Sequence, residues 1–451
     1  MNYTPHTPED IRVMLEKIGV RNIEELFDTI PEELRLKQPL NLPRPLSELE
    51  AVAELTRLAS RNTGTDQLIC FAGAGAYDHY RPAIIDTIIA RSEFYTAYTP
   101  YQAEVSQGTL QSIYEFQSLV CRLLEMEVAN ASMYDGASAL AETVHMARDI
   151  TGRQQVLVSS TVNPIYREVI ATYAHGLNVP IGTISAREYL TDINNLKGQI
   201  NAETAAVILQ HPNFFGFLEP VREIARLAHD TGALFIVACD PISTGVIQPP
   251  GAYDADIAVA EGQALGIPLA LGGPYLGILT AKKRYIRNMP GRIAARTVDT
   301  EGKTGYVLAL QTREQHIRRE RATSNICTNQ ALCALAATVY LAWMGREGIK
   351  EVARQCLAKT GYLANRIAAI PGFTIPGTHR FFKELVVKTP VPAKEIITAG
   401  ITRGILAGVD LGRFTPEWHN LLLIAVTEKR TRHEIDALIQ LLKSFGSSNG
   451  M

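Results

Sequence analysis

The chain has 451 residues and a formal net charge of −2, with 46% hydrophobic and 20% charged residues. This length exceeds what one hydrophobic core usually serves, and the composition excludes disordered and fibrous proteins. The small net charge, without long runs of like charge, argues against a nucleic-acid partner. No stretch approaches the roughly 20 apolar residues of a membrane span, and the N-terminus lacks the features of a signal peptide. We therefore expect a cytoplasmic protein without a membrane partner.

The six cysteines are widely separated and include no Cys-x-x-Cys pair. Closely spaced cysteines would be needed for a disulfide framework or a zinc site. We therefore expect buried, reduced thiols and no metal site.

Residues 1–65 are predicted to form an N-terminal helical arm. Thr7 precedes a proline and two acids and begins a first helix, and a short helix follows at 30–33. Ser47 and Glu50 form a capping box that begins a third helix, with apolar residues at helical spacing behind it. Such an arm has no core of its own, so we expect it to wrap another surface.

Residues 66–325 are predicted to form a large α/β domain. Short apolar runs at 155–158, 206–209 and 234–238 alternate with amphipathic helices such as 220–231. This alternation is typical of a mostly parallel sheet covered on both faces. A charged helical segment is expected to follow at 312–320.

Residues 326–451 are predicted to form a smaller α+β domain. The expected elements are a helix at 330–347, strands at 382–387 and 421–426, and a helix at 432–444.

Two features of the large domain suggest places for an anion and a cation. Asp135, Gly136 and Ser138 begin a helix with a small residue, a hydroxyl and free backbone amides, which is how helix N-termini hold a phosphate. Asp240 follows an apolar strand, where enzymes that use pyridoxal phosphate (PLP) place the acid that pairs with the ring nitrogen. A capped helix start and an ordinary loop acid explain the same residues equally well.

A PLP enzyme also needs a lysine that forms an imine with the cofactor aldehyde, usually a few tens of residues after that acid. After Lys197 no lysine follows until Lys282, and the segment between them offers Gln263, whose amide cannot form an imine. An exposed basic turn explains Lys282 and Lys283. The chain is therefore built like a PLP enzyme that has lost its lysine.

Three further segments invite a functional interpretation. Residues 73–78 suggest a dinucleotide loop, but Asp78 stands where the third glycine belongs, so we reject NAD binding. The aromatic loop with Tyr98, Tyr101 and Gln102 is suited to orient a small zwitterion, or is a surface turn. The basic segment 315–325 is suited to anion recognition, or is an ion-paired helix face.

Five segments of the chain stand out as a set, at 98–102, 107–108, 135–138, 272–275 and 312–330. Together they resemble the glycine cleavage system P-protein family, and the similarity covers nearly the whole chain. The segment 312–330 is long enough to be highly specific. In that family the enzyme is one long chain with two homologous halves or two separate subunits, and this chain resembles the separate N-terminal half, the alpha subunit.

The resemblance implies the type I fold of PLP-dependent transferases, similar to aspartate aminotransferase. It implies pairing with a beta subunit, in an α2β2 assembly, in which the beta subunit carries the lysine and holds PLP. No residue of this chain would be the Schiff-base lysine, and Gln263 lies near that position.

The resemblance also implies roles for particular residues. Thr323, Ser324 and Asn325 are expected to reach the partner's cofactor phosphate. Tyr98, Tyr101 and Gln102 are expected to line the active site. The implied vestigial pocket on this chain comprises Asp135, Gly136, Ser138 and Asp240.

The implied activity is that of glycine dehydrogenase (aminomethyl-transferring, decarboxylating). Glycine binds through PLP, its carboxylate leaves as carbon dioxide, and the aminomethyl group passes to the oxidised lipoyl group of the H-protein, whose disulfide is reduced. The T- and L-proteins would be the other components of the system. Two alternatives stay open: an autonomous PLP-dependent lyase that uses Lys282 or Lys283, and a non-catalytic scaffold subunit that retains the fold.

Overall fold

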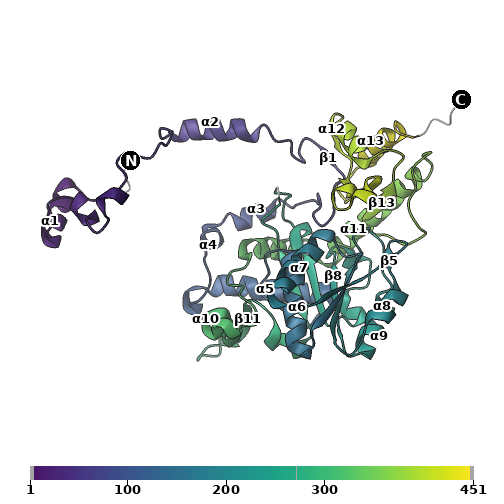
Figure 1. Cartoon of the computed structure of the whole chain (residues 1–451), viewed down its shortest axis with the longest axis horizontal. Coiled ribbons are helices and arrows are strands. Elements are labelled where there is room, and N and C mark those ends of the chain that lie inside the picture. The colour runs from purple at the N-terminus through teal and green to yellow at the C-terminus, as the bar shows by residue number, and fades with distance from the viewer. Residues whose placement is uncertain (1–4, 271, 447–451) are drawn as a thin grey trace. The chain divides into compact units, whose positions relative to one another are not determined.

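The structure is a computed structural model that describes residues 5–270 and 272–446 (Figure 1). The chain divides into two compact units, Met1–Asn62 and Thr63–Met451. The further division expected at residues 325 and 326 stays a prediction.

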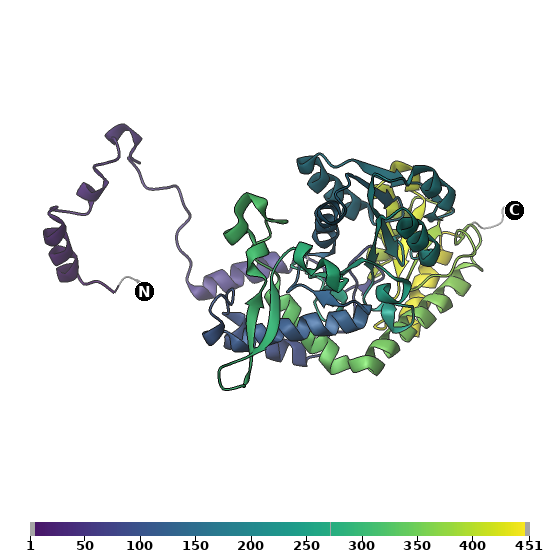
Figure 2. The ribbon, with the colours of Figure 1, turned by 90° about the horizontal axis from the view of Figure 1, so that it is seen from below.

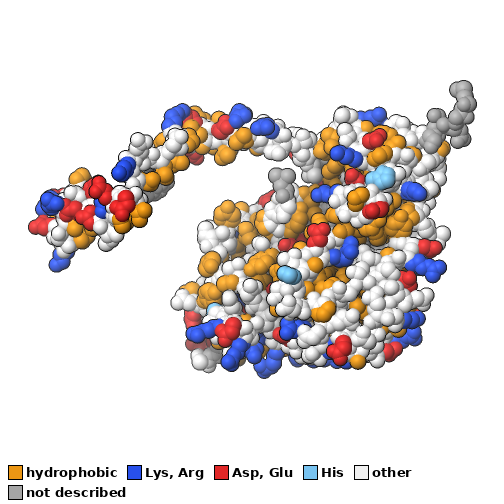
Figure 3. All heavy atoms as spheres, viewed as in Figure 1, with side chains coloured by type: hydrophobic (Ala, Val, Ile, Leu, Met, Phe, Trp, Pro, Cys, Tyr) orange, Lys and Arg blue, Asp and Glu red, His pale blue; other side chains and the backbone are white. Residues whose placement is uncertain are grey.

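The first unit is the helical arm. It contains α1 (Pro8–Ile18), α2 (Glu48–Ala59) and two 3₁₀ turns, Glu24–Phe27 and Glu32–Leu34. Capping boxes at Thr7 and Ser47 begin the two helices, as predicted from the sequence. None of these four elements contains a buried residue, and hydrophobic side chains lie open along the arm (Figure 3).

The second unit is built around a seven-stranded sheet in the order β2-β10-β9-β8-β7-β3-β4. Strands β9, β8, β7, β3 and β4 run parallel, and β10 is antiparallel to both of its neighbours. The mostly parallel sheet predicted from the sequence is therefore confirmed. The strands are β2 (Val128–Ala129), β3 (Gln155–Ser159), β4 (Ile181–Ile184), β7 (Thr204–His211), β8 (Leu234–Cys239), β9 (Ile257–Glu261) and β10 (Gly277–Ala281).

Helices cover both faces of this sheet, because alternate residues of each strand point to opposite sides and both sides are apolar. Val156 and Ile208 pack with α6 (Gly136–Thr151) and α7 (Pro164–Leu177). Leu157 and Val207 pack in the core that also holds residues of other helices, three of them ten residues or longer. These are α5 (Gln107–Leu124), α9 (Val221–Asp230) and α11 (Ala331–Ile367), and Figure 2 shows the green α11 running beside the blue α5.

A second, three-stranded antiparallel sheet has the order β13-β16-β15 and packs with α12 and α13. We call residues 371–446 the C-terminal lobe. Strand β1 (Ile69–Cys70) pairs in parallel with β14 (Ile405–Leu406) (Figure 1). The chain therefore contacts this lobe before it enters the large sheet. The other elements of the lobe are β13 (Glu384–Lys388), α12 (Ala393–Ile401), β15 (Val409–Asp410), β16 (Leu421–Ala425) and α13 (Arg432–Lys443).

The remaining elements are short. They include the hairpin of β11 (Ile293–Val298) and β12 (Thr304–Ala309) and the pair of β5 (Ala186–Arg187) and β6 (Leu190–Thr191). The short helices are α3 (Ile84–Ile89), α4 (Ser92–Tyr95), α8 (Ile193–Gln199) and α10 (Gln315–Arg318). Within the described residues, no helix is both long and apolar enough to cross a membrane.

One helix prediction was wrong in extent. The helix expected at 312–320 is broken into α10 and two 3₁₀ turns, because Arg319 has φ 52° and ψ −128°, outside the helical region. The helix expected at 330–347 is present as the first of two helical segments within Ala331–Ile367, which meet at Gly345, where φ is 59° and ψ is −173°. Glycine tolerates that conformation, so the two helical segments meet there without a loop.

Candidate functional site

The carboxyl ends of the parallel strands bring acids of separate segments together. Residues Cys239 of β8 and Ala260 of β9 are register partners, so Asp240 and Glu261 follow at the same edge. They line a cavity of about 30 Å³ together with Gly75, Tyr77, Tyr166, Gln210, Ala238, Cys239, Pro241, Ala260 and Ala264. We call this the strand-end pocket. It lies where doubly wound sheets commonly bind ligands.

The start of α6 faces this pocket. Asp135 caps the helix by accepting a 2.7 Å hydrogen bond from the amide of Ser138. The amide of Gly136 donates to Oε2 of Glu261 at 2.9 Å. A side chain at position 136 would lie 2.7 Å from the Tyr166 hydroxyl, which is why glycine is needed there. The helix start expected to hold a phosphate is thus occupied by a carboxylate of the same chain.

Glu261 is held by two further amides. Its Oε1 accepts hydrogen bonds from the amides of Gln263 at 2.9 Å and Leu276 at 3.1 Å. Burial raises the pKa of Glu261 to about 7, although the three amides favour its ionised form.

Asp240 pairs with a lysine from the C-terminal lobe. Nζ of Lys383 lies 2.7 Å from Oδ2 of Asp240, and the Lys383 side chain is only 2% exposed. Sequence reasoning missed this residue. The available signal was a charged pair, Lys383 and Glu384, inside the apolar run 381–387. Charged residues are rarely buried unless they are paired, so such a run indicates an internal ion pair.

The Lys383 ammonium has two more neighbours. It lies 2.9 Å from Nε2 of His79 and 3.5 Å from the ring centroid of Tyr77. Because an ammonium only donates, Nε2 accepts, and the Nδ1–H group of His79 donates to Glu428 over 2.6 Å. Burial would raise the pKa of Glu428, but His79 and the Tyr80 amide outweigh burial and lower it to about 2.

The same cluster contains potential metal ligands. Ligand atoms of His79, Cys356 and Glu428 all lie within 4.8 Å of one another. Lys383 already brings a positive charge to Nε2 of His79. We therefore interpret the cluster as an ion-pair network and not as a cation site.

Gln263 lies in the segment without lysines between Lys197 and Lys282. Its Oε1 accepts a 2.8 Å bond from the amide of Tyr77, and its Nε2 donates to the carbonyls of Tyr77 at 3.0 Å and Ile267 at 2.8 Å. The side chain is 1% exposed. Gln263 therefore joins the 73–78 loop to the end of β9 and has no catalytic group to offer.

The residues of the strand-end pocket do not fit PLP. Ligand pockets usually measure roughly 300–1,000 Å³, whereas this cavity has about 30 Å³. The acid, Asp240, and the amide, Gly136, that would bind opposite ends of the cofactor are both paired within the chain.

A buried acid beside this pocket makes stability depend on pH. Burial raises the pKa of Glu384 to about 7, and the nearby Asp240 adds to this rise. Hydrogen bonds from the Ala74 amide and the Tyr77 hydroxyl, both 2.7 Å, and the nearby Lys383 lower the pKa and so offset part of the effect of burial. The folded pKa exceeds the unfolded value, so this contribution is fully present below about pH 4.5 and is lost as pH rises through about 7.

We therefore expect Glu384→Gln to remove that loss. Between pH 5 and pH 8, the free energy of unfolding of the wild-type chain should fall by about 3 kcal/mol more than that of the variant. Denaturant unfolding at both pH values measures the difference. Glu395→Gln, at an exposed acid of α12, is the control. Parallel pH profiles for wild type and Glu384→Gln would contradict the assignment.

The tyrosine loop lies apart from the strand-end pocket. Tyr98 is 79% exposed and lines a second cavity of about 150 Å³, and Gln102 is exposed. The Tyr101 hydroxyl accepts a 2.9 Å hydrogen bond from Arg292, and its ring lies 6.1 Å from that of His316. Tyr101 thus joins this loop to the segment around 312–325, as one surface.

The segment with Thr323, Ser324 and Asn325 belongs to this surface. Thr323 is half-buried and Asn325 is exposed. The Ser324 hydroxyl donates to Oε1 of Glu142 at 2.8 Å, and burial raises the pKa of Glu142 to about 7. We call Tyr98, Tyr101, Gln102 and residues 316–325 the loop surface. None of them lines the strand-end pocket, so the structure groups the predicted site residues into two places.

Lys282 and Lys283 belong to neither place. Lys283 is exposed, but Lys282 is partly buried, with its Nζ 2.7 Å from Asp254 and 2.9 Å from Asp256. The expected exposed turn is therefore wrong for Lys282. Asp256 precedes β9, at the amino edge of the sheet, opposite the carboxyl edge that carries Asp240.

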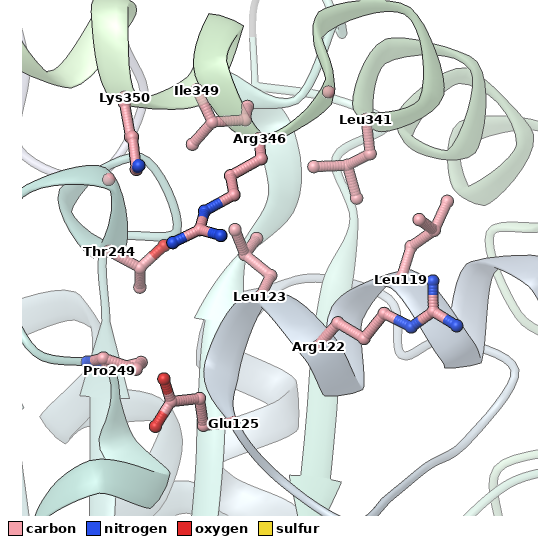
Figure 4. A pocket seen from close by; sticks show the side chains of 12 residues that line it. Leu119, Arg122, Leu123, Glu125, Thr244, Pro249, Leu341, Arg346, Ile349 and Lys350 are labelled. Atoms are coloured by element: carbon pink, nitrogen blue, oxygen red, sulfur yellow. The ribbon is translucent and has the colours of Figure 1, made fainter.

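A third cavity, of about 540 Å³, lies between α5, α11 and the turn at 243–245 (Figure 4). Its lining is mainly apolar, with Leu119 and Leu123 on α5, while Arg346 extends from α11 toward Thr244. It contains none of the residues predicted to be functional.

The comparisons with known proteins cover nearly the whole chain. The sequence model of the family described as "Glycine cleavage system P-protein" matches residues 1–442. A protein of Carboxydothermus hydrogenoformans is 54% identical over 98% of this chain and 99% of its own length. One of Desulforamulus reducens is 53% identical over 97% and 98%. Both are described as "Probable glycine dehydrogenase (decarboxylating) subunit 1".

Solved structures agree with the sequence comparisons. The crystal structure of a glycine decarboxylase (P-protein) of the glycine cleavage system, in inhibitor-bound form, superposes with a TM-score of 0.91 and 42% identity, covering 99% of this chain and all of that one. A sphingosine-1-phosphate lyase of Burkholderia pseudomallei, with a TM-score of 0.64 and 14% identity over 92% and 94%, shares the fold. The expected α/β fold, the PLP-dependent transferase fold of type I, is thereby confirmed. The chain belongs to the glycine cleavage system P-protein family.

Proposed function

We propose that this chain is the first, alpha subunit of a two-subunit glycine decarboxylase that acts only with a beta subunit. The observation that carries the proposal is Gln263, which lies near the position that the resemblance gives to the lysine and is fixed by three hydrogen bonds to the backbone. An imine-forming amine must then come from another chain, and the relatives named as subunit 1 are consistent with that division.

In this proposal PLP is held by the beta subunit and supplies the electron sink for loss of carbon dioxide from glycine. The aminomethyl group then passes to the lipoyl arm of the H-protein, whose disulfide is reduced. The T- and L-proteins would complete the system in the cytoplasm. This chain would position groups and exclude water, and would contribute no covalent step.

The loop surface is the part of this chain that we propose to face the partner's cofactor. Thr323 and Asn325 would donate hydrogen bonds to the phosphate, and Ser324 would do so by exchanging its bond to Glu142 on assembly. Arg318 and Arg321 nearby are exposed and cationic. Arg319 is held at a positive φ that non-glycine residues rarely adopt. Strained backbone of this kind concentrates at binding sites, which supports the assignment.

Tyr98, Tyr101 and Gln102 would line the same active site from the side. The bond between Tyr101 and Arg292 and the contact with His316 support this placement, because they tie the tyrosine loop to the cofactor-facing segment. In this proposal Arg292 holds the hydroxyl of Tyr101, while Tyr98, which is exposed, remains free to contact the partner.

The helical arm supports an assembly with a partner, which we propose to be α2β2. Its leucines remain exposed, with Leu36 at 77% and Leu49 at 81%. Exposed apolar residues in such a row mark a surface that a second chain covers.

The alternative of an autonomous lyase is disfavoured by the position of Lys282, whose ammonium is paired with Asp254 and Asp256 at the other edge of the sheet. The scaffold alternative differs from our proposal only in whether the loop surface affects catalysis.

The location of the cofactor amine tests the proposal. The co-expressed complex is reduced with borohydride and digested, and the lysine that carries the pyridoxyl group is identified by mass spectrometry. We expect the label on a lysine of the beta subunit and none on this chain. A pyridoxyl group on Lys282, Lys283 or Lys383 would overturn the proposal.

A further inference from the structure

A cation and an anion of the chain itself lie at the strand-end pocket: Glu261 lines it, and Lys383 pairs with Asp240, which also lines it. The Lys383 ammonium lies 2.7 Å from Asp240, and the Glu261 carboxylate lies 2.9 Å from the Gly136 amide. In a PLP enzyme of this fold, the acid after the strand pairs with the cofactor's cationic ring nitrogen, and the helix start binds its phosphate. Lys383 thus places a positive charge where the cofactor's ring nitrogen would lie, and Glu261 places a negative charge where its phosphate would lie.

The Lys383 ammonium is fully engaged. Its three N–H groups have three neighbours, Oδ2 of Asp240, Nε2 of His79 and the face of the Tyr77 ring. The next residue, Glu384, accepts hydrogen bonds from the Ala74 amide and the Tyr77 hydroxyl. As an ammonium, Lys383 has no lone pair with which to attack an aldehyde, and each of its three N–H groups already has a partner.

These contacts join three separate parts of the second unit. Lys383 and Glu428 belong to the C-terminal lobe, Asp240 to the end of the large sheet, and His79 to the 73–81 loop that lies between them in the network. Asp78 of the same loop pairs with Arg430 of the lobe at 3.0 Å. The contact between sheet and lobe is therefore made by buried charges. Substituting one of these charged residues should loosen the contact.

We propose that this pocket is permanently filled by Lys383 and Glu261 in place of PLP, and that it acts as a latch that fixes the C-terminal lobe against the large sheet. The inference goes beyond the proposed function, because a beta subunit could hold the cofactor whether or not this pocket is filled.

The latch makes the response to substitution non-additive. Lys383→Met leaves the Asp240 carboxylate in the pocket without its cation. The double variant, Lys383→Met with Asp240→Asn, removes both charges of this pair. The asparagine side chain also keeps the oxygen that accepts a hydrogen bond from the Ile242 amide. The matched control is Lys388→Met, at an exposed lysine at the far end of β13, the strand that follows Lys383 directly.

Amide hydrogen exchange of the full-length chain measures the latch. In Lys383→Met we expect exchange in segments 73–81 and 427–430 to accelerate about tenfold or more, with no change in Lys388→Met and with most of the protection recovered in the double variant. Unchanged amide exchange in Lys383→Met would overturn the latch. So would a double variant in which these segments exchange as fast as in Lys383→Met.

Two measurements on the wild-type chain need no variant. Acetic anhydride should acetylate Lys388 and leave Lys383 unmodified, and equilibrium dialysis against PLP should leave no stoichiometric cofactor on the isolated chain. Rapid acetylation of Lys383, or one PLP retained per chain, would overturn the proposal. A chain that bound PLP yet turned over glycine only with its partner would overturn the latch and leave the need for a partner intact.

Discussion

Replacing Thr323 by valine in the assembled enzyme is expected to lower glycine-dependent carbon dioxide exchange about tenfold to a hundredfold. Valine has nearly the shape of threonine but lacks the hydroxyl that we propose to donate to the partner's cofactor phosphate. Since Thr323 makes no side-chain hydrogen bond within the described chain, its loss should leave the fold unchanged. PLP affinity of the complex, by fluorescence titration, should weaken together with the rate.

Two variants control this result. Thr323→Ser restores a hydroxyl and should recover most of the activity, and Thr312→Val changes an exposed threonine of the same segment without effect. Light scattering checks that assembly with the partner is intact. Full activity of Thr323→Val would remove Thr323 from the site and favour a scaffold role for this chain.

Replacing Asp78 by alanine is expected to destabilise the chain by about 3–5 kcal/mol. Oδ2 of Asp78 pairs with Arg430 at 3.0 Å, Oδ1 with Lys429 at 2.6 Å, and both Asp78 and Arg430 side chains are less than a tenth exposed. Without Asp78, Glu434 at 3.5 Å is the only carboxylate among the described residues that still pairs with the buried guanidinium. Urea unfolding monitored by circular dichroism measures the difference.

The control for this prediction is Asp86→Ala. Asp86 pairs with Arg81, but its side chain is 66% exposed, so the loss should stay below about 1 kcal/mol. Asp78→Asn, which retains the shape and one acceptor, should fall between the two. Equal stability of Asp78→Ala and Asp86→Ala would mean that the Asp78 pair contributes nothing to the contact between loop and lobe.

The regular part of the fold could be predicted from local sequence patterns. The runs that became β3, β7 and β8 are apolar on both faces, and the capping boxes at Thr7 and Ser47 begin the predicted helices. The break at Arg319 could not be predicted, because nothing in its neighbours excludes a helix. The kink at Gly345 was hidden because the helical pattern continues on both sides of it.

The candidate site could be predicted only in part. Asp240, Gln263 and Gly136 were found because each is placed by an element boundary that the sequence itself reveals. Lys383 was missed because it directly precedes β13, about 140 residues after Asp240, and only the fold brings the two within 2.7 Å. The search for a lysine extended forward from the acid by local spacing, and a residue supplied by another lobe has no such spacing.

The most direct test of the central claim is glycine-dependent carbon dioxide exchange, with PLP and H-protein added, by this chain alone and after co-expression with its beta subunit. The account predicts no exchange by the isolated chain and activity in the complex, because Gln263 and the paired Lys383 offer no imine-forming amine. Exchange by the isolated chain would contradict it.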